Sequence, residues 1–132
     1  MVAVLGTQRQ VFDIEHRPRS RGEKWLWATE DLDMATVGPA RVELAELFTV
    51  GPPPRHVLVY VGPDRFVDLQ GLQLLLDLAG QVRRRGGDLA VAAAPHCLEK
   101  MVKIFELGEQ LPIVATTRRI TWPACNRTAA QR

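Results

Sequence analysis

The chain contains almost no serine, and its central part has no aliphatic hydroxyl group at all. Ser20 is the only serine, and residues 51–114 contain neither serine nor threonine. A serine nucleophile needs a histidine base and an orienting carboxylate, whereas Ser20 stands in the charged stretch Pro18–Gly22, which is typical of a turn. We therefore expect no serine-hydrolase chemistry, and no phosphorylation of serine or threonine within residues 51–114.

The chain is also poor in cysteine, with Cys97 and Cys125 as its only two. A structural zinc site needs four ligands, and the three histidines, at positions 16, 56 and 96, show no ligand spacing to either cysteine. Cys97 follows His96 directly, but neighbouring residues of a helix point about 100° apart, which disfavours a thiol–base pair. We predict two free thiols, no disulfide, no metal and no cofactor.

Phosphate-binding motifs are missing as well, because neither Gly-x-Gly-x-x-Gly nor a Walker loop occurs. Gly86 and Gly87 follow a helical pattern and are predicted to end that helix. Glu30–Asp33 is acidic, but divalent-ion sites usually recruit ligands from more than one segment, so we expect a solvated turn there. These absences predict a protein that is not an enzyme.

No long hydrophobic run is present. The longest apolar stretches fall well short of the roughly 20 residues that cross a bilayer, and Met1–Gly6 is too short for a signal peptide. We expect a cytoplasmic protein without stable insertion into a membrane.

Negative charge is absent from the C-terminal end. No acidic residue follows Glu109, whereas four arginines do, at positions 118, 119, 127 and 132. Subtracting these four from the 17 basic residues leaves 13 against 15 acidic ones, a mildly acidic body. A nucleic-acid binder needs a basic face on the fold itself, and Arg83–Arg85 stands where a helix should end and complements its dipole. We predict one domain over residues 1–117, a basic tail over 118–132, and no nucleic-acid partner.

The hydrophobic pattern predicts strands that alternate with helices. Alternating or continuous apolar runs favour strands, and apolar residues three and four apart favour helices. The predicted strands cover residues 9–16, 24–29, 56–61, 89–94 and 111–115, and the predicted helices cover 39–50, 71–85 and 95–108. Such an order implies right-handed crossovers. We expect an α/β fold: a mixed, mostly parallel sheet of four or five strands covered by three or four helices.

Three segments of this pattern occur together in a recognisable order. Glu30–Asp33 follows the second strand, Phe66–Leu72 reads Phe-Val-Asp-Leu-Gln-Gly-Leu before the leucine-rich helix, and Arg85–Val91 reads Arg-Gly-Gly-Asp-Leu-Ala-Val. Together they resemble the STAS domain, the family of sulfate transporters and anti-sigma factor antagonists. The resemblance covers about Phe12 to Ala115, and its middle motif keeps its aromatic, aspartate and glycine frame.

The resemblance implies a bacterial regulator of transcription that binds a kinase-like anti-sigma factor. In that family the serine before the motif glycine is phosphorylated by the partner, and here this position is Gln70, with Leu69 before it. Gln70 is neutral and resembles the unmodified, binding-competent state, so the resemblance predicts a docking loop without a phosphorylation switch. The predicted partner-binding residues are Asp68, Leu69, Gln70, Gly71 and Leu72, with Asp31 and Asp33.

Several alternatives stay open at this stage. In the first, Leu69 packs under the helix and Gln70 is an ordinary surface residue. The domain then binds elsewhere or serves as a structural subunit. A second alternative is a cytoplasmic STAS accessory subunit of an ABC-type lipid transporter, suggested by the leucines of Gly71–Leu76. A third is a small-ligand sensor that uses Tyr60 with Trp25 and Trp27. The sequence is also compatible with a homodimer.

Overall fold

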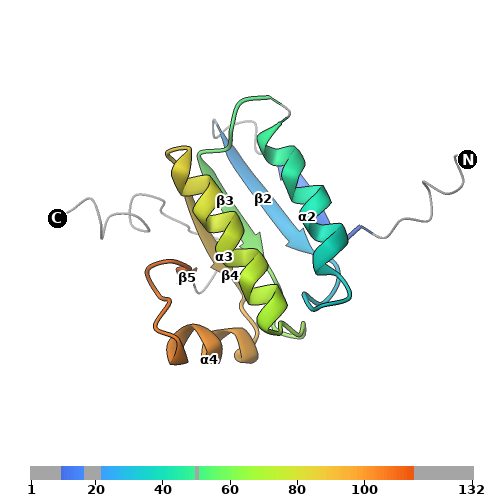
Figure 1. The fold of residues 1–132 in the computed structure, drawn as a ribbon, viewed down its shortest axis with the longest axis vertical. Coiled ribbons are helices and arrows are strands. Elements are labelled where there is room, and N and C mark those ends of the chain that lie inside the picture. Colours follow the sequence, from blue (N-terminus) through green and yellow to red (C-terminus); the bar gives the residue numbers. More distant parts are fainter. Residues whose placement is uncertain (1–9, 17–21, 50, 115–132) are drawn as a thin grey trace, which may run out of the picture.

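The computed structural model describes residues 10–16, 22–49 and 51–114, and these form one five-stranded sheet with helices (Figure 1). The strands lie side by side in sequence order, and β1 runs antiparallel to β2 while all other neighbours are parallel. Their bounds are β1 Phe12–His16, β2 Glu23–Ala28, β3 His56–Tyr60, β4 Asp88–Ala92 and β5 Ile113–Val114. The predicted mixed, mostly parallel sheet is confirmed.

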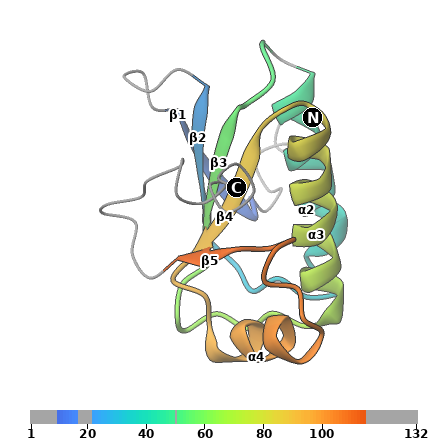
Figure 2. The same ribbon diagram turned by 90° about the vertical axis from the view of Figure 1, so that its left-hand side faces the viewer.

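Helices follow the strands in the predicted alternation. Their bounds are α2 Val37–Ala45, the short 3-10 helix η1 Glu46–Phe48, α3 Leu69–Arg84 and α4 His96–Ile104. Figure 2 shows α2 and α3 on one face of the sheet and α4 at one end of it, and in the described part of the chain no helix lies on the opposite face. None of the described helices is both long and apolar enough to span a bilayer.

The main core lies between the sheet and α2 and α3. Alternate residues of each strand face it, as Val57 and Val59 of β3 do, while Leu58 and Tyr60 face the other side. The α3 residues buried against this face are Gly71, Leu72, Leu74, Leu75, Leu78, Ala79 and Val82. The spacing predicted an inner stripe of Leu72, Leu75, Leu76, Ala79 and Val82 for this helix. All of these but the partly buried Leu76 are buried, and Leu74 and Leu78 also belong to the stripe.

The helix before β3 buries only part of its predicted apolar stripe. The spacing predicted a stripe of Val42, Leu44, Ala45, Leu47 and Phe48. Val42 and Ala45 are exposed, Phe48 packs against the core, and the residues buried in it are Ala40, Leu44 and Leu47. These three residues are spaced by four and three positions, so they form a stripe of their own. Because valine and alanine occur on both sides of this helix, the periodicity alone did not decide which side faces the core.

Two elements, α4 and β5, are shorter than predicted. α4 ends at Ile104 instead of Gly108, because Glu106 adopts a left-handed conformation with φ of 54° and the N–H of Leu107 donates to the carbonyl of Val102 at 2.8 Å. This arrangement satisfies a carbonyl at the helix end and turns the chain away. β5 has two residues where five were predicted.

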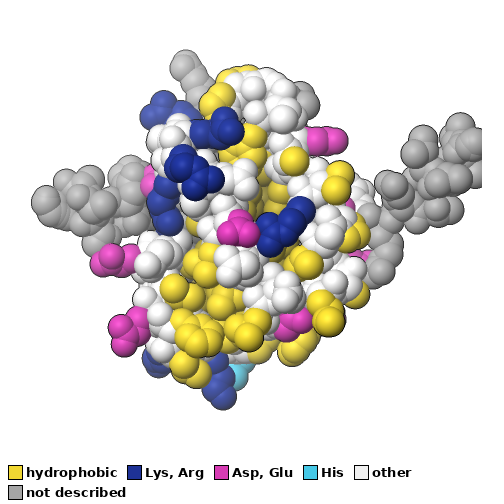
Figure 3. Space-filling view, in the orientation of Figure 1, with side chains coloured by type: hydrophobic (Ala, Val, Ile, Leu, Met, Phe, Trp, Pro, Cys, Tyr) yellow, Lys and Arg dark blue, Asp and Glu magenta, His cyan; other side chains and the backbone are white. Residues whose placement is uncertain are grey.

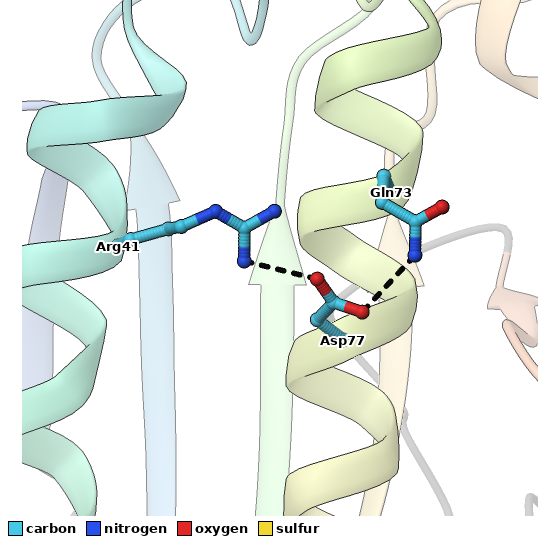
Figure 4. Close-up of polar contacts among 3 residues, drawn as sticks. All are labelled: Arg41, Gln73 and Asp77. Atoms are coloured by element: carbon cyan, nitrogen blue, oxygen red, sulfur yellow. Dashed lines mark hydrogen bonds and ion pairs between the residues drawn. The ribbon is translucent and has the colours of Figure 1, made fainter.

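α2 and α3 are also joined on their outer surface. The guanidinium of Arg41 contacts a carboxylate oxygen of Asp77 at 2.9 Å, and the amide of Gln73 donates to the other oxygen at 3.0 Å (Figure 4). Both charged side chains are about half exposed, so this ion pair contributes at most about 1 kcal/mol.

The predicted basic tail over 118–132 and the domain boundary at 117 lie outside the described residues.

Candidate functional site

The predicted site residues meet where two loops cross at the carboxyl ends of β2 and β3. The N–H of Leu32 donates to the carbonyl of Phe66 at 2.9 Å, and the N–H of Asp68 donates to the carbonyl of Leu32 at 3.1 Å. Leu32 and Val67 thereby form a short parallel bridge. Parallel strands end on the same edge of a sheet, and this edge is where ligands of open α/β folds commonly bind.

The aspartates of the site hold these loops together. Asp31 Oδ1 accepts a hydrogen bond from the N–H of Phe66 at 2.9 Å, and Asp68 Oδ2 accepts one from the N–H of Met34 at 3.3 Å. Asp33 Oδ1 accepts from the N–H of Ala35 at 3.0 Å, within its own turn. The acidic turn is therefore a structural element tied to the motif loop, a role that the expected solvated turn did not include.

The hydroxyl of Thr36 completes this turn from the inside. Thr36 is buried, and its hydroxyl donates to the carbonyl of Asp31 at 2.8 Å and accepts from the N–H of Asp33 at 3.0 Å. A buried hydroxyl is stable only when it is paired in this way. The loop before α2 is consequently fixed at both its start and its end.

Asp68 is the N-cap of α3. Its backbone is extended, and its Oδ1 accepts from the N–H of Gly71 at 3.0 Å, which satisfies one of the free N–H groups at the helix start. The helix therefore begins at Leu69, two residues before its predicted start at Gly71. Leu69 and Gln70 belong to the first turn of α3 and not to a loop, which corrects the sequence prediction.

Gly71 and Leu72 lie inside this arrangement. A Cβ on Gly71 would overlap the carbonyl oxygen of Leu32 and would lie 2.8 Å from the Leu32 Cβ, so only glycine allows this approach. Leu72 is 4% exposed and packs in the main core. Both residues were predicted to bind a partner, but the structure gives them a packing role because their positions on α3 face the sheet.

Leu69 projects in the opposite direction. It is 61% exposed, which excludes the alternative in which it packs under the helix. Met34 and Phe66, on the two crossing loops, are 73% and 52% exposed. We call Met34, Phe66 and Leu69 the loop patch, and Figure 3 shows hydrophobic side chains gathered at the end of the molecule where α3 begins.

Sequence reasoning missed Met34, and it counted Phe66 only as a motif match. The pattern did contain a signal, because Met34 interrupts a polar turn and Phe66 precedes the buried Val67. Adjacent residues of an extended segment face opposite sides, so an inward Val67 turns Phe66 outward. Gln70, the residue after Leu69, is exposed as well.

The aromatic residues considered for a small-ligand site lie elsewhere. Trp25, Trp27 and Tyr60 form a row on the sheet face opposite α2 and α3, with ring centroids 5.8 Å apart for the two tryptophans and 4.7 Å apart for Trp27 and Tyr60. They are separate from the loop patch.

The described residues offer few side chains for catalysis or metal binding. No group of three or more histidine, cysteine, aspartate or glutamate side chains in residues 10–16, 22–49 and 51–114 could hold a metal ion. The sulfur of Cys97 accepts a hydrogen bond from the N–H of Val67 at 3.4 Å, and so helps to position the motif loop. Cys125 lies outside the described residues.

Comparisons with known proteins find solved structures with a similar fold. No protein-family model and no curated protein matches the sequence. Among solved structures, an anti-sigma factor antagonist from Mycobacterium paratuberculosis matches with a TM-score of 0.66 and 16% identity, over 92% of this chain and 93% of that one. The unphosphorylated anti-sigma factor antagonist SpoIIAA of Bacillus matches with a TM-score of 0.62 and 18% identity, over 89% of this chain and 96% of that one.

A third match concerns part of a longer protein. SLC26A9 matches with a TM-score of 0.57 and 15% identity, over 98% of this chain but only 26% of that one. At identities this low, these structural matches establish a common fold. The chain therefore has the STAS fold, the fold of the anti-sigma factor antagonists that it resembles.

Proposed function

We propose that this chain is a protein-binding domain that acts like an anti-sigma factor antagonist and docks on a kinase-like anti-sigma factor through the loop patch. The observation that carries the proposal is the exposure of Leu69 in the first turn of α3, beside the Asp68 cap. A large apolar side chain exposed in this way, with Met34 and Phe66 near it, is typical of a contact surface.

The loop patch is suited to binding because its backbone is already ordered. Asp31 and Asp68 each accept a backbone N–H from the other loop, so little conformational freedom is lost when a partner binds. Burying a side chain such as Leu69 is worth about 1.5 to 3 kcal/mol. A few such anchors supply most of the affinity of a typical interface.

Gln70 makes this a docking site without a phosphorylation switch. It is exposed in the first turn of α3, where free N–H groups and the helix dipole would favour a phosphate, but its amide cannot accept one. The surface therefore stays neutral at this position. In this proposal, regulation comes from the amount of protein or from the partner, and the chain needs no catalytic residue of its own.

The test is calorimetric titration of the full chain into a purified kinase-like anti-sigma factor from the same genome. Leu69→Asp should weaken binding by at least tenfold, because it places a charge at the centre of an apolar contact. Ile104→Asp is the matched control, since Ile104 is 67% exposed in the last turn of α4 and belongs to neither crossing loop. Equal binding by both variants and the unchanged chain would reject the loop patch.

A second candidate function is an accessory subunit of an ATP-driven lipid transporter. The match to 26% of SLC26A9 fits it, because it shows the same fold as one part of a much longer protein. In that case the full chain should co-purify with the transporter's ATPase subunit and should not be retained by an anti-sigma factor. The predicted cytoplasmic location and the homodimer remain predictions under either function.

A further inference from the structure

The end of α4 carries a second exposed apolar surface, which belongs to neither crossing loop. Ile104, the last residue of α4, is 67% exposed, and Phe105, which follows it, is 51% exposed. We call these two residues the α4 patch. Figure 3 shows hydrophobic side chains gathered over α4. Neither residue is part of the loop patch, and the proposed function gives neither of them a role.

The core of the domain does not use the α4 patch. α4 buries Leu98 and Val102, which lie one turn apart on its inner side. Ile104 comes two positions after Val102, and a helix turns by about 200° over two residues, so Ile104 points to the outer side. The helix ends there, and Phe105 stays half exposed. Single apolar residues are common on a protein surface, but two large neighbours in water are typical of a contact site.

Charged residues flank the α4 patch on both sides in the sequence. Lys100 and Lys103 precede it on α4, and Glu106 and Glu109 follow it. All four side chains are exposed, and within the described chain none of them forms an ion pair. The charges around the α4 patch are therefore available to a partner.

These charges are arranged symmetrically about the centre of the α4 patch. Lys103 and Glu106 lie equally far from that centre in the sequence. Lys100 and Glu109 do so as well, and each of the two pairs combines opposite signs. In a two-fold contact a surface meets a copy of itself. Two copies that cross in opposite directions at the α4 patch therefore bring the lysines of one copy to the glutamates of the other.

We propose that the α4 patch binds the α4 patch of a second copy, so that the domain forms a two-fold dimer. Ile104 of each copy packs on Phe105 of the other, and the flanking lysines and glutamates pair across the contact. A lipid surface fits less well, because helices that lie on membranes are rich in lysine and arginine, whereas two lysines and two glutamates flank this patch. The contact does not use the loop patch, and the proposal does not depend on the proposed function.

The contact is small, and the dimer is accordingly weak. A standard interface takes roughly 20 to 30 residues from each partner, whereas the α4 patch and its four flanking charges make six. We expect half of the chains to be paired at about 0.1 mM. Exposed ion pairs are screened by salt, so the dissociation constant of the dimer should rise with ionic strength.

Sedimentation equilibrium of the full chain tests the proposal. The mass should rise with concentration from the 14.7 kDa of one chain towards twice that value. Ile104→Asp should raise the dissociation constant of the dimer by at least tenfold, because it places a charge in the apolar contact. Leu69→Asp is the matched control, since Leu69 is 61% exposed in the loop patch, and it should leave the constant unchanged.

Two results of this experiment would overturn the proposal. One is a chain that stays monomeric up to about 1 mM. The other is a dimer that Ile104→Asp leaves intact, with circular dichroism showing the same fold in the variant and in the unchanged chain. A dimer that is lost only in Leu69→Asp belongs to the second case, since it would form through the loop patch instead.

Charge reversal tests the pairing of lysines with glutamates. A chain with Lys100→Glu and Lys103→Glu should be monomeric, and so should a chain with Glu106→Lys and Glu109→Lys. An equal mixture of the two should form a dimer with one copy of each, because the glutamates of one chain then face the lysines of the other. If the mixture stays monomeric where the unchanged chain dimerises, the two-fold arrangement is wrong.

Vesicles of phosphatidylglycerol test the other occupant of the α4 patch. Under this proposal Ile104→Asp should leave any flotation of the full chain with these vesicles unchanged. Flotation that is lost in Ile104→Asp would assign the α4 patch to a lipid surface and overturn the dimer.

Discussion

The backbone N–H of Met34 donates a hydrogen bond to Oδ2 of Asp68 at 3.3 Å, across 34 positions of the sequence. The other oxygen of the same carboxylate accepts the N–H of Gly71 at 3.0 Å. One side chain therefore caps α3 and holds the loop before α2 in place. The two elements that present the loop patch are thus joined through this carboxylate, in addition to the hydrogen bond between Phe66 and Asp31.

Replacing Asp68 with alanine should destabilise the domain by about 1 to 2 kcal/mol, because the helix cap is lost. Asp68→Asn is the informative control, since an asparagine can still cap the helix but offers only one acceptor oxygen. It should therefore cost less than alanine. Urea unfolding followed by circular dichroism measures both values, and an equal loss in the two variants would show that the cap is not what Asp68 contributes.

Gly71 and Gly80 allow a comparison within one helix. An alanine is normally favoured over glycine in a helix interior by about 1 kcal/mol, and a Cβ on Gly80 would meet only the flexible end of Arg84, at 3.7 Å. Gly80→Ala should therefore stabilise the domain. Gly71→Ala should destabilise it, because its Cβ would overlap the carbonyl of Leu32.

Unfolding midpoints in urea should thus move in opposite directions for these two variants. The comparison removes helix propensity as an explanation, since both changes are glycine to alanine in α3. A Gly71→Ala variant as stable as Gly80→Ala would mean that the loop carrying Leu32 can move away at no cost.

The order of strands and helices was predictable because strong local patterns define it. His56–Tyr60 belongs to a continuous apolar run, as buried parallel strands do, and Gly86 adopts the positive φ of 86° expected just beyond a helix end. These signals lie within a few residues of the structure that they describe. The face of α2 was harder, because Val42 and Ala40 are equally apolar in pattern and only packing against the sheet distinguishes them.

The motif pattern placed Asp31, Asp68 and Leu69 in one candidate site, but it missed Met34 and did not reveal what each residue does. Asp31 contacts the N–H of Phe66, 35 positions away, and no local pattern reveals such a pairing. Gly71 was identified only as a motif position, whereas the physical reason for a glycine there is the close approach of Leu32. The exposure of Met34 depends on where Asp68 holds its loop, which only the tertiary structure determines.

Glu43 joins α2 to the start of β1. Its carboxylate accepts the N–H of Val11 at 2.7 Å and that of Phe12 at 2.8 Å. Glu43→Gln leaves one acceptor for two donors, and an unsatisfied, partly buried N–H costs about 1 to 3 kcal/mol. Glu46→Gln, on the exposed side of η1, is the control and should change stability by less than about 0.5 kcal/mol. Chemical unfolding compares them, and similar small losses would argue that β1 does not need this carboxylate.

Gln70 separates the stability of the domain from its proposed binding. Because Gln70 is exposed, Gln70→Glu should change the free energy of unfolding by no more than about 0.5 kcal/mol. The same variant should bind the anti-sigma factor more weakly, since it brings a negative charge next to Leu69 and Asp68, as a phosphate would. Gln70→Ala removes the amide without adding charge and should keep most of the affinity. Calorimetric titration of the three chains decides the matter: if glutamate and alanine bind equally well, charge at this position does not control docking, and the neutrality of Gln70 has no functional meaning.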